Sequence, residues 1–276
     1  MSGPAPGAGA PPARLAMSPP DHFVVAYEIN PFMHVAVAVD HERAAAQWDG
    51  LRAVLVGLGA EVRLQPPAPG LPDLVFTANA GLVLEGVVVP ARFRHPERRG
   101  EEAVDRAWFA AQGLEVRELP GPHPFEGAGD AMPAGPVGVV LAGYRWRTGI
   151  GAHVELARAL GRPVRSLALT DPRFYHLDLA LLPLGPRRAL AVGAAFDAYA
   201  RRVVGAVVPE VEELSLDEGL AFVANAVVVG DAVVVHRCPP RVGRLLAAWG
   251  YEAVESPVDE YLKAGGSCRC LTLGLS

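Results

Sequence analysis

A short aromatic and polar motif returns every 47 to 50 residues along the chain, and this period limits the folds open to it more than any other feature. The segment 76–80 reads Phe-Thr-Ala-Asn-Ala, and the segment 222–226 reads Phe-Val-Ala-Asn-Ala. A repeat of this length cannot bury its apolar face alone, so neighbouring units must stack. The equivalent loop positions of five consecutive units are Asn79, Glu126, His176, Asn225 and Cys270.

Each repeat also holds one helical stretch and a further short strand. In the first stretch Trp48, Leu51 and Leu55 recur at steps of three and four, which is typical of one helix face. The predicted helices are 41–58, 101–112, 151–160, 196–207 and 241–249, and the strands after them are 61–64, 115–119, 163–167, 211–214 and 252–255. The chain is therefore predicted to be α/β, with five units of ββαβ type.

Five such units without capping repeats favour a closed ring, which makes the fold a fivefold pseudo-symmetric α/β-propeller. Residues 271–275 and 23–29 read as single strands that could complete the first unit. An open α/β sheet with a chance period is the alternative. Ring closure would bring the five equivalent loop positions to one axis.

The two parts of the chain differ in composition. Residues 1–19 are mostly Gly, Ala, Pro and Ser, which predicts a disordered extension, whereas residues 20–276 are expected to form one domain. The net charge is −5 and there is no dense Lys/Arg block, so nucleic acid is not an expected partner. The sequence contains no apolar run long enough to predict a membrane span. Three cysteines make no disulfide framework, which indicates a reducing, cytoplasmic compartment.

The residue types at the equivalent positions suggest a catalytic site. A thiolate is a strong nucleophile, and an imidazole oriented by a carboxylate is an acid or base. Cys270, His176 and Glu126 could fill these roles, and Asp178 shares a strand face with His176 if that segment is extended. Cys268 is the competing nucleophile, because the spacing hardly separates it from Cys270.

Four ordered motifs carry a resemblance to a known group of proteins. They are 72–79 (Pro-Asp-Leu-Val-Phe-Thr-Ala-Asn), 125–130 (Phe-Glu-Gly-Ala-Gly-Asp), 174–178 (Phe-Tyr-His-Leu-Asp) and 263–272 (Lys-Ala-Gly-Gly-Ser-Cys-Arg-Cys-Leu-Thr). The chain resembles the guanidino-group-modifying enzymes of the pentein superfamily, which are fivefold α/β-propellers. Segments 19–23, 29–33, 76–83 and 92–98 resemble the cyanobacterial-type arginine dihydrolase in particular, and similar bacterial sequences are commonly interpreted as dimethylargininases.

The resemblance implies a single catalytic domain and a covalent mechanism. Cys270, rather than Cys268, attacks the guanidinium carbon to form a thiouronium adduct. His176 then protonates the departing amine and activates water, while Glu126 holds the guanidinium or the imidazole. Asp178 binds guanidinium N–H groups.

Other positions are implied to bind the rest of the substrate. Arg92 and Arg147 resemble positions that grip the α-carboxylate, as two guanidinium forks can. Asn79 stands where deiminases and many dimethylargininases carry an acid. Since an amide both donates and accepts, it could hold a cationic guanidinium and then a neutral ureido group, which favours a dihydrolase. Asn30, which resembles the second Asn of the dihydrolase type, points the same way.

Several alternatives stay open at this stage. Arginine dihydrolase and dimethylargininase compete closely, and an amidinotransferase, which passes the same adduct to an amine, follows them. A non-catalytic pentein-fold binding protein would not need Cys270, His176 and Glu126 together. A zinc site is disfavoured because the Cys-x-Cys spacing is too short. The family needs no metal or organic cofactor, the expected partner is a small guanidino compound, and a homo-oligomer is compatible with the sequence.

Overall fold

The computed structural model describes residues 12–275, which form a mixed α/β fold built on five three-stranded sheets. The strand orders are β15-β1-β2, β3-β4-β5, β6-β7-β8, β11-β10-β9 and β12-β13-β14. The strands are β1 (Arg14–Met17), β2 (Glu61–Leu64), β3 (Gly81–Leu84), β4 (Val87–Pro90), β5 (Glu115–Val116), β6 (Ala131–Ala134), β7 (Val139–Tyr144), β8 (Val164–Ala168), β9 (Leu181–Leu184), β10 (Arg188–Ala191), β11 (Glu210–Glu213), β12 (Val227–Val229), β13 (Ala232–Val235), β14 (Glu252–Glu255) and β15 (Leu273–Gly274).

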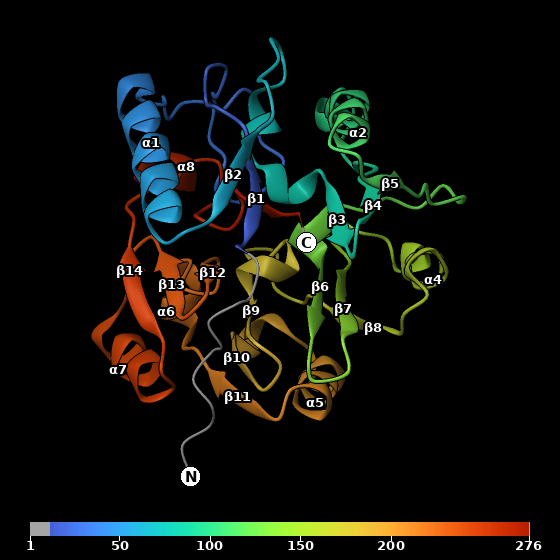
Figure 1. Ribbon diagram of the computed structural model, residues 1–276, viewed down its shortest axis with the longest axis vertical. Helices are drawn as coiled ribbons and strands as arrows, with labels where there is room; N and C mark the ends of the chain where they lie inside the picture. Colours follow the sequence, from blue (N-terminus) through green and yellow to red (C-terminus); the bar gives the residue numbers. More distant parts are fainter. Residues whose placement is uncertain (1–11, 276) are drawn as a thin grey trace.

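The longer helices link the second and third strands of the sheets, and the shorter ones precede first strands. The α-helices are α1 (His41–Gly57), α2 (Glu101–Ala111), α3 (Gly127–Asp130), α4 (Ile150–Leu160), α5 (Ala198–Val207), α6 (Leu216–Leu220), α7 (Pro240–Ala248) and α8 (Asp259–Leu262). Short 3₁₀ turns are η1 (Pro72–Val75), η2 (Thr77–Asn79), η3 (Pro96–Arg98), η4 (Leu177–Leu179) and η5 (Gly193–Ala195). In Figure 1 the long helices lie at the periphery, and the first strands of the sheets lie nearer the middle.

The same strand pattern recurs in every sheet. The first two strands are antiparallel, as β3 and β4 are, and a helix then leads to a third strand that runs parallel to the second. The predicted α/β class and the five repeated units are confirmed. In the remaining sheet β15 plays the part of the first strand, so this sheet combines segments from both ends of the described chain.

The predicted beginning of the first unit is wrong. Arg14–Met17 forms β1, although it lies within the expected disordered extension 1–19, whereas 23–29 forms no strand. Leu15, Ala16 and Met17 are buried, and this apolar run is long enough to pair with both β15 and β2. The surrounding Pro-rich composition concealed it. Residues 1–11 of that extension lie outside the described residues.

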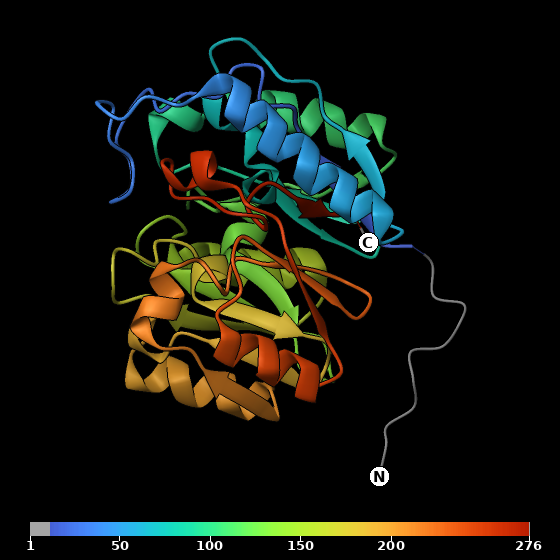
Figure 2. The ribbon, with the colours of Figure 1, turned by 90° about the vertical axis from the view of Figure 1, so that its left-hand side faces the viewer.

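The α1 helix shows why the helical prediction succeeded. Asp40 accepts a hydrogen bond from the Arg43 backbone as its N-cap, and Trp48, Leu51 and Leu55 are buried as the periodicity predicted. Figure 2 shows the C-terminal segment, in red, running inside the molecule between α1 and α7. No helix among the described residues is long and apolar enough to cross a bilayer.

Candidate active site

The five equivalent loop positions all come just before the first strand of a sheet. Asn79 ends η2 before β3, Glu126 precedes α3 and β6, and His176 precedes η4 and β9. Asn225 and Cys270 lie before β12 and β15. Each sheet therefore presents one of these side chains at the end where its first strand begins.

A small buried cavity brings several of these residues together. Its lining residues are Asn30, Asp73, Phe76, Asn79, Arg98, Arg147, Tyr175, His176, Ala264, Gly266 and Cys270. Of the predicted site residues, Asn30, Asn79, Arg147, His176 and Cys270 therefore share one cavity. Glu126 and Asp178 lie directly behind this lining and contact it.

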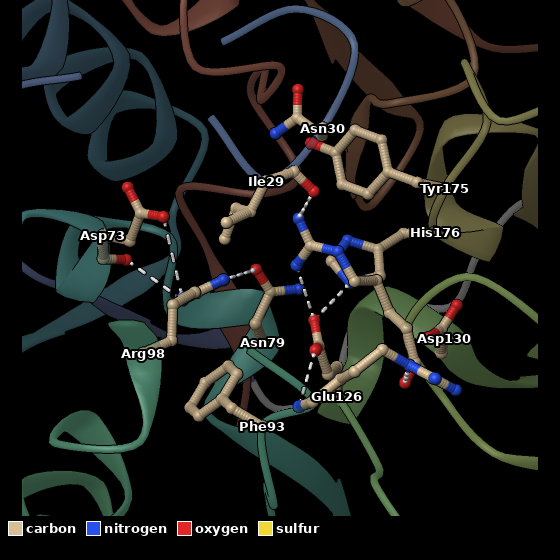
Figure 3. A network of polar contacts seen from close by, with 12 residues as sticks. Ile29, Asn30, Asp73, Asn79, Phe93, Arg98, Glu126, Asp130, Tyr175 and His176 are labelled. Carbon is tan, nitrogen blue, oxygen red and sulfur yellow. Dashed lines mark hydrogen bonds and ion pairs between the residues drawn. The ribbon is translucent and has the colours of Figure 1, made fainter. Parts of the chain in front are cut away.

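The imidazole of His176 is held by a buried carboxylate. Oε2 of Glu126 lies 2.8 Å from His176 Nε2 and accepts a hydrogen bond of 2.9 Å from Arg147 (Figure 3). Burial would raise the pKa of Glu126, but the Arg147 guanidinium and the His176 hydrogen bond outweigh it and hold that pKa well below its usual value. Glu126 is therefore a fixed negative charge that orients the His176 imidazole.

The thiol of Cys270, which lines the same cavity, lies among polar groups. Asn225 donates to Cys270 Sγ at 3.2 Å and accepts from the Cys270 backbone N–H, while the thiol lies 3.6 Å from Asp178 Oδ2. Burial and the nearby Asp178 raise the pKa of Cys270 well above its ordinary value. In the absence of a cation this sulfur is therefore a thiol, and a bound guanidinium would favour the thiolate.

The neighbouring thiol of Cys268 faces elsewhere. Its sulfur donates to the Ser256 carbonyl at 3.6 Å, and it does not line the cavity. Burial raises the pKa of Cys268 to about 12. The geometry thus separates two cysteines that the spacing alone could not.

Asp178 and Asp130 lie buried beside the two reacting groups. Burial raises the pKa of Asp178 to about 7, and its Oδ1 has no hydrogen-bond partner among residues 12–275. Asp130 accepts from the backbone N–H groups of Thr148 and Leu177, which fixes the segments that carry Arg147 and His176. Burial raises the pKa of Asp130 to about 6.

Arg92 is a correction to the predicted site. Its backbone pairs with Phe125, and its guanidinium donates to the Leu119 carbonyl at 2.8 Å instead of lining the cavity. Arg98, six residues later, lines the cavity in its place. The β-bridge to Phe125 fixes the backbone of Arg92, and the hydrogen bond to the Leu119 carbonyl holds its guanidinium.

Arg98 and Asp73 are site residues that the sequence reasoning missed. Arg98 is buried, forms an ion pair with Glu101 at 2.7 Å and donates to Asn79 Oδ1 at 2.8 Å (Figure 3). The carboxylate of Asp73 lies 3.8 Å from Arg98, and burial raises the pKa of Asp73. Both residues lie inside segments that carry the family resemblance, and that resemblance is the signal that could have identified them.

Asn30 and Tyr175 anchor the segment that precedes the nucleophile. Asn30 Nδ2 donates to the Ala264 carbonyl at 3.0 Å, and the Tyr175 hydroxyl donates to the Gly265 carbonyl at 2.7 Å. Gly265 has φ +81, and a Cβ there would lie 2.7 Å from the Tyr175 hydroxyl. Only glycine therefore permits this close approach.

A metal centre is not indicated by the arrangement. Within residues 12–275, no group of three or more His, Cys, Asp and Glu side chains is placed to hold a metal ion. The chemistry that the cavity can perform is nucleophilic attack by sulfur, with proton transfer at His176 and binding of a cation between carboxylates.

Comparisons with known proteins agree with that chemistry, although no family model matches the chain. It is 43% identical over 263 residues to the bifunctional arginine dihydrolase/ornithine cyclodeaminase ArgZ of Synechocystis, which covers 94% of this chain and 37% of that protein. The chain thus spans little more than a third of this relative. It is 42% identical over 260 residues to the N(G),N(G)-dimethylarginine dimethylaminohydrolase of Mycobacterium tuberculosis, covering 94% of this chain and 85% of that one.

Solved structures give the same result. The N-terminal domain of ArgZ bound to substrate, described as an arginine dihydrolase from Cyanobacteria, aligns with a TM-score of 0.91 at 42% identity. The match covers 96% of this chain and 98% of that domain. A dimethylarginine dimethylaminohydrolase adduct aligns with a TM-score of 0.77 at 22% identity, which supports the fold alone.

Proposed function

Because the chain belongs to the pentein family of arginine dihydrolases and dimethylarginine dimethylaminohydrolases, we propose that it is a cysteine-dependent hydrolase of the guanidino group of arginine or an N-methylated arginine. One observation carries the proposal: Cys270 and His176 line the same cavity, and Glu126 holds the imidazole at 2.8 Å. A nucleophile, an acid/base and an orienting carboxylate are what this covalent chemistry needs.

The first half of the reaction forms a C–S bond and breaks a C–N bond. The guanidinium lies beside Asp178, whose unpartnered Oδ1 accepts its N–H groups, and its charge favours the Cys270 thiolate, so that the thiol releases its proton to solvent as the substrate binds. The sulfur attacks the guanidinium carbon, and the leaving amine takes a proton from His176. Glu126 orients the imidazole for this transfer through the contact at His176 Nε2.

The second half returns the enzyme to its starting state. His176 removes a proton from water, the oxygen adds to the carbon of the thiouronium adduct, and the C–S bond breaks. Arginine and one water thus give a ureido product and ammonia. If the ureido carbon is attacked again, a second water gives ornithine, carbon dioxide and a second ammonia.

Within this class we favour the two-step dihydrolase, and Asn79 is the reason. Arg98 can only donate, so the oxygen of Asn79 must face it and the amide Nδ2 must point the other way. In Figure 3 this nitrogen lies on the side of Glu126 and His176. A donor there can bind the oxygen of a ureido group, which a carboxylate could not do.

The alternative substrate is a methylated arginine, since a dimethylarginine dimethylaminohydrolase is as similar in sequence as the dihydrolase.

Five features complete the proposal. The five sheets close into a ring, for which the pairing of β1 with β15 is support. One catalytic domain starts no later than β1. It acts in the cytoplasm, with a small guanidino compound as its partner, and needs no cofactor.

A product survey tests the proposal. The chain is incubated with arginine, monomethylarginine, dimethylarginine, agmatine and succinylarginine, and products are identified by mass, with Cys270→Ser as the control. Ornithine and ammonia from arginine, absent with the variant, are the expected result. Accumulation of citrulline without ornithine would overturn the two-step reaction, and no turnover of any guanidine would overturn the class.

A further inference from the structure

A second cavity lies among the first strands of the sheets, and we call it the inner-strand cavity. Its volume is about 470 Å³, and it shares no lining residue with the cavity that holds Cys270. Residues of β1, β3, β6, β9, β12 and β15 surround it. The proposed reaction does not use it.

The charged groups that line this cavity are all positive. Arg14 and Arg269 are its only titratable lining residues, and almost all of the others are Gly, Ala, Pro, Val, Leu or Met. Thr272 supplies the single hydroxyl. Two guanidinium groups therefore stand against an aliphatic wall that contains no lining carboxylate.

The guanidinium of Arg269 has no direct side-chain partner in the described part of the chain, although its charge opposes the rise that burial causes in the pKa of Asp178. It forms no ion pair and no side-chain hydrogen bond with residues 12–275, and its Nε is buried without a partner. Arg14 uses one nitrogen, which donates to the Leu275 carbonyl at 3.4 Å. A buried N–H donor without an acceptor, as at Arg269 Nε, costs free energy, so a ligand with acceptor oxygens would be stabilised here.

The position of Arg269 links this cavity to the catalytic one. Arg269 and Cys270 are consecutive, and they line different cavities. The backbone N–H of Arg269 donates to the Asn225 carbonyl at 3.2 Å, and the Asn225 side chain contacts Cys270. The segment 269–270 is therefore the wall between the two sites.

We propose that the inner-strand cavity binds a small organic anion, whose carboxylate or phosphate pairs with Arg269 and Arg14 while its apolar body packs on the aliphatic wall. Guanidinium forks match such oxyanions in geometry and charge. The volume falls in the range of small-molecule pockets, about 300–1,000 Å³. The aliphatic lining favours a ligand that carries apolar surface as well as charge.

Calorimetric titration of the full chain tests this site directly. The probes are hexanoate, hexyl phosphate, inorganic phosphate and the neutral hexanamide, so the series separates carboxylate from phosphate and charge from apolar contact. We expect saturable one-to-one binding of hexanoate or hexyl phosphate, and affinity at least roughly tenfold weaker for hexanamide. Arg269→Gln should weaken binding by a similar factor.

Two further variants make the result specific. Val228→Phe narrows the cavity and leaves both arginines in the sequence, so it tests the site even if Arg269→Gln fails to fold. Arg165→Gln is the matched control, because Arg165 is an exposed residue of β8 outside both cavities. Val228→Phe should weaken binding, and Arg165→Gln should leave it unchanged.

Three results would overturn the proposal: no saturable binding up to about 10 mM of any anion, binding that neither Arg269→Gln nor Val228→Phe weakens, or binding that arginine displaces from Cys270→Ser protein. The last would place the anion in the catalytic cavity. None of these readouts requires turnover, so failure of this site and failure of the proposed hydrolysis are distinguishable.

Discussion

Arg98 donates a hydrogen bond of 2.8 Å to Oδ1 of Asn79, and this contact fixes which atoms of the amide face the catalytic cavity. A guanidinium can only donate hydrogen bonds, so the Asn79 atom that faces Arg98 must be the amide oxygen. The Asn79 Nδ2 is buried and has no partner among residues 12–275. A donor in this position is the observation on which we base the proposal of two hydrolyses rather than one.

Asn79→Asp should therefore change the product rather than only the rate. The carboxylate would keep the contact with Arg98, but it would present an acceptor where the ureido oxygen needs a donor. We expect citrulline to accumulate at the expense of ornithine when arginine is the substrate, as measured by mass spectrometry over a time course. An unchanged ornithine-to-citrulline ratio would contradict the role given to Asn79.

The two cysteines near the C-terminus should differ in their response to serine. Cys270→Ser should lower kcat by at least about a thousandfold, because the hydroxyl is a much weaker nucleophile. Cys268→Ser should retain most activity, within roughly threefold, because serine can make the same hydrogen bond to the Ser256 carbonyl. Rates with arginine and the mass of the trapped adduct check both; the opposite pattern would move the nucleophile to Cys268.

The repeat explains how much of the site could be predicted. Asn79, His176 and Cys270 occupy one position in successive units, so their spacing in the sequence encodes their meeting in space. Arg98 could not be found in this way, because it lies outside the repeated position and reaches the cavity through η3 and its ion pair with Glu101. Choosing between Arg92 and Arg98 needed the contact of Arg92 with Leu119.

The fold, like the site, could be predicted where the sequence signal is local and not where it depends on distant partners. Helices such as α1 carry their burial pattern in their own sequence, so local periodicity sufficed. The strand β1 is only four residues long, and what stabilises it is pairing with β15 and β2 at distant points of the chain. A segment whose partners are this far away leaves little local signal.

Gly129→Ala should disturb catalysis without unfolding the protein. A Cβ at this position would lie 2.3 Å from Asn79 Nδ2 and 3.4 Å from the His176 ring, so the amide must move. A displacement of this size in a catalytic group can cost on the order of a hundredfold in rate. We expect kcat to fall by about tenfold or more with a similar melting temperature. Gly86→Ala is the control, since a Cβ there would meet nothing within 4 Å, although its φ of +82 adds backbone strain.

The stability of the protein should fall as pH rises because of Asp105. This buried side chain accepts a hydrogen bond of 2.7 Å from Gln65, and burial raises its pKa to about 7. Between pH 4 and 7 the folded protein therefore holds a proton that the unfolded chain has released, which makes the slope of unfolding free energy with pH negative. The stabilising contribution is complete below about pH 4 and is lost as pH approaches 7.

Asp105→Asn removes this titration and keeps an acceptor for Gln65. Urea unfolding at pH 5 and pH 7.5 should show a smaller loss of stability in the variant than in the natural chain. Because the interval from pH 5 to pH 7.5 covers about two pH units of this titration, the pKa shift sets an upper bound of about 3 kcal/mol on the difference. An equal pH dependence in both proteins would show that Asp105 is already ionised when buried.

A matched pair of arginine substitutions compares Arg92, which the sequence predicted to grip the substrate α-carboxylate, with Arg98, which lines the cavity in its place. Arg92→Gln loses one hydrogen bond to the Leu119 carbonyl, so it should cost about 1 kcal/mol of stability and leave KM for arginine within roughly twofold. Arg98→Gln alone would leave Glu101 buried and unpaired, at about 3–5 kcal/mol. The double variant Arg98→Gln/Glu101→Gln avoids that penalty. We expect it to fold and to raise KM by about tenfold or more, as steady-state kinetics would measure; a larger KM effect from Arg92→Gln would restore the prediction made from the sequence.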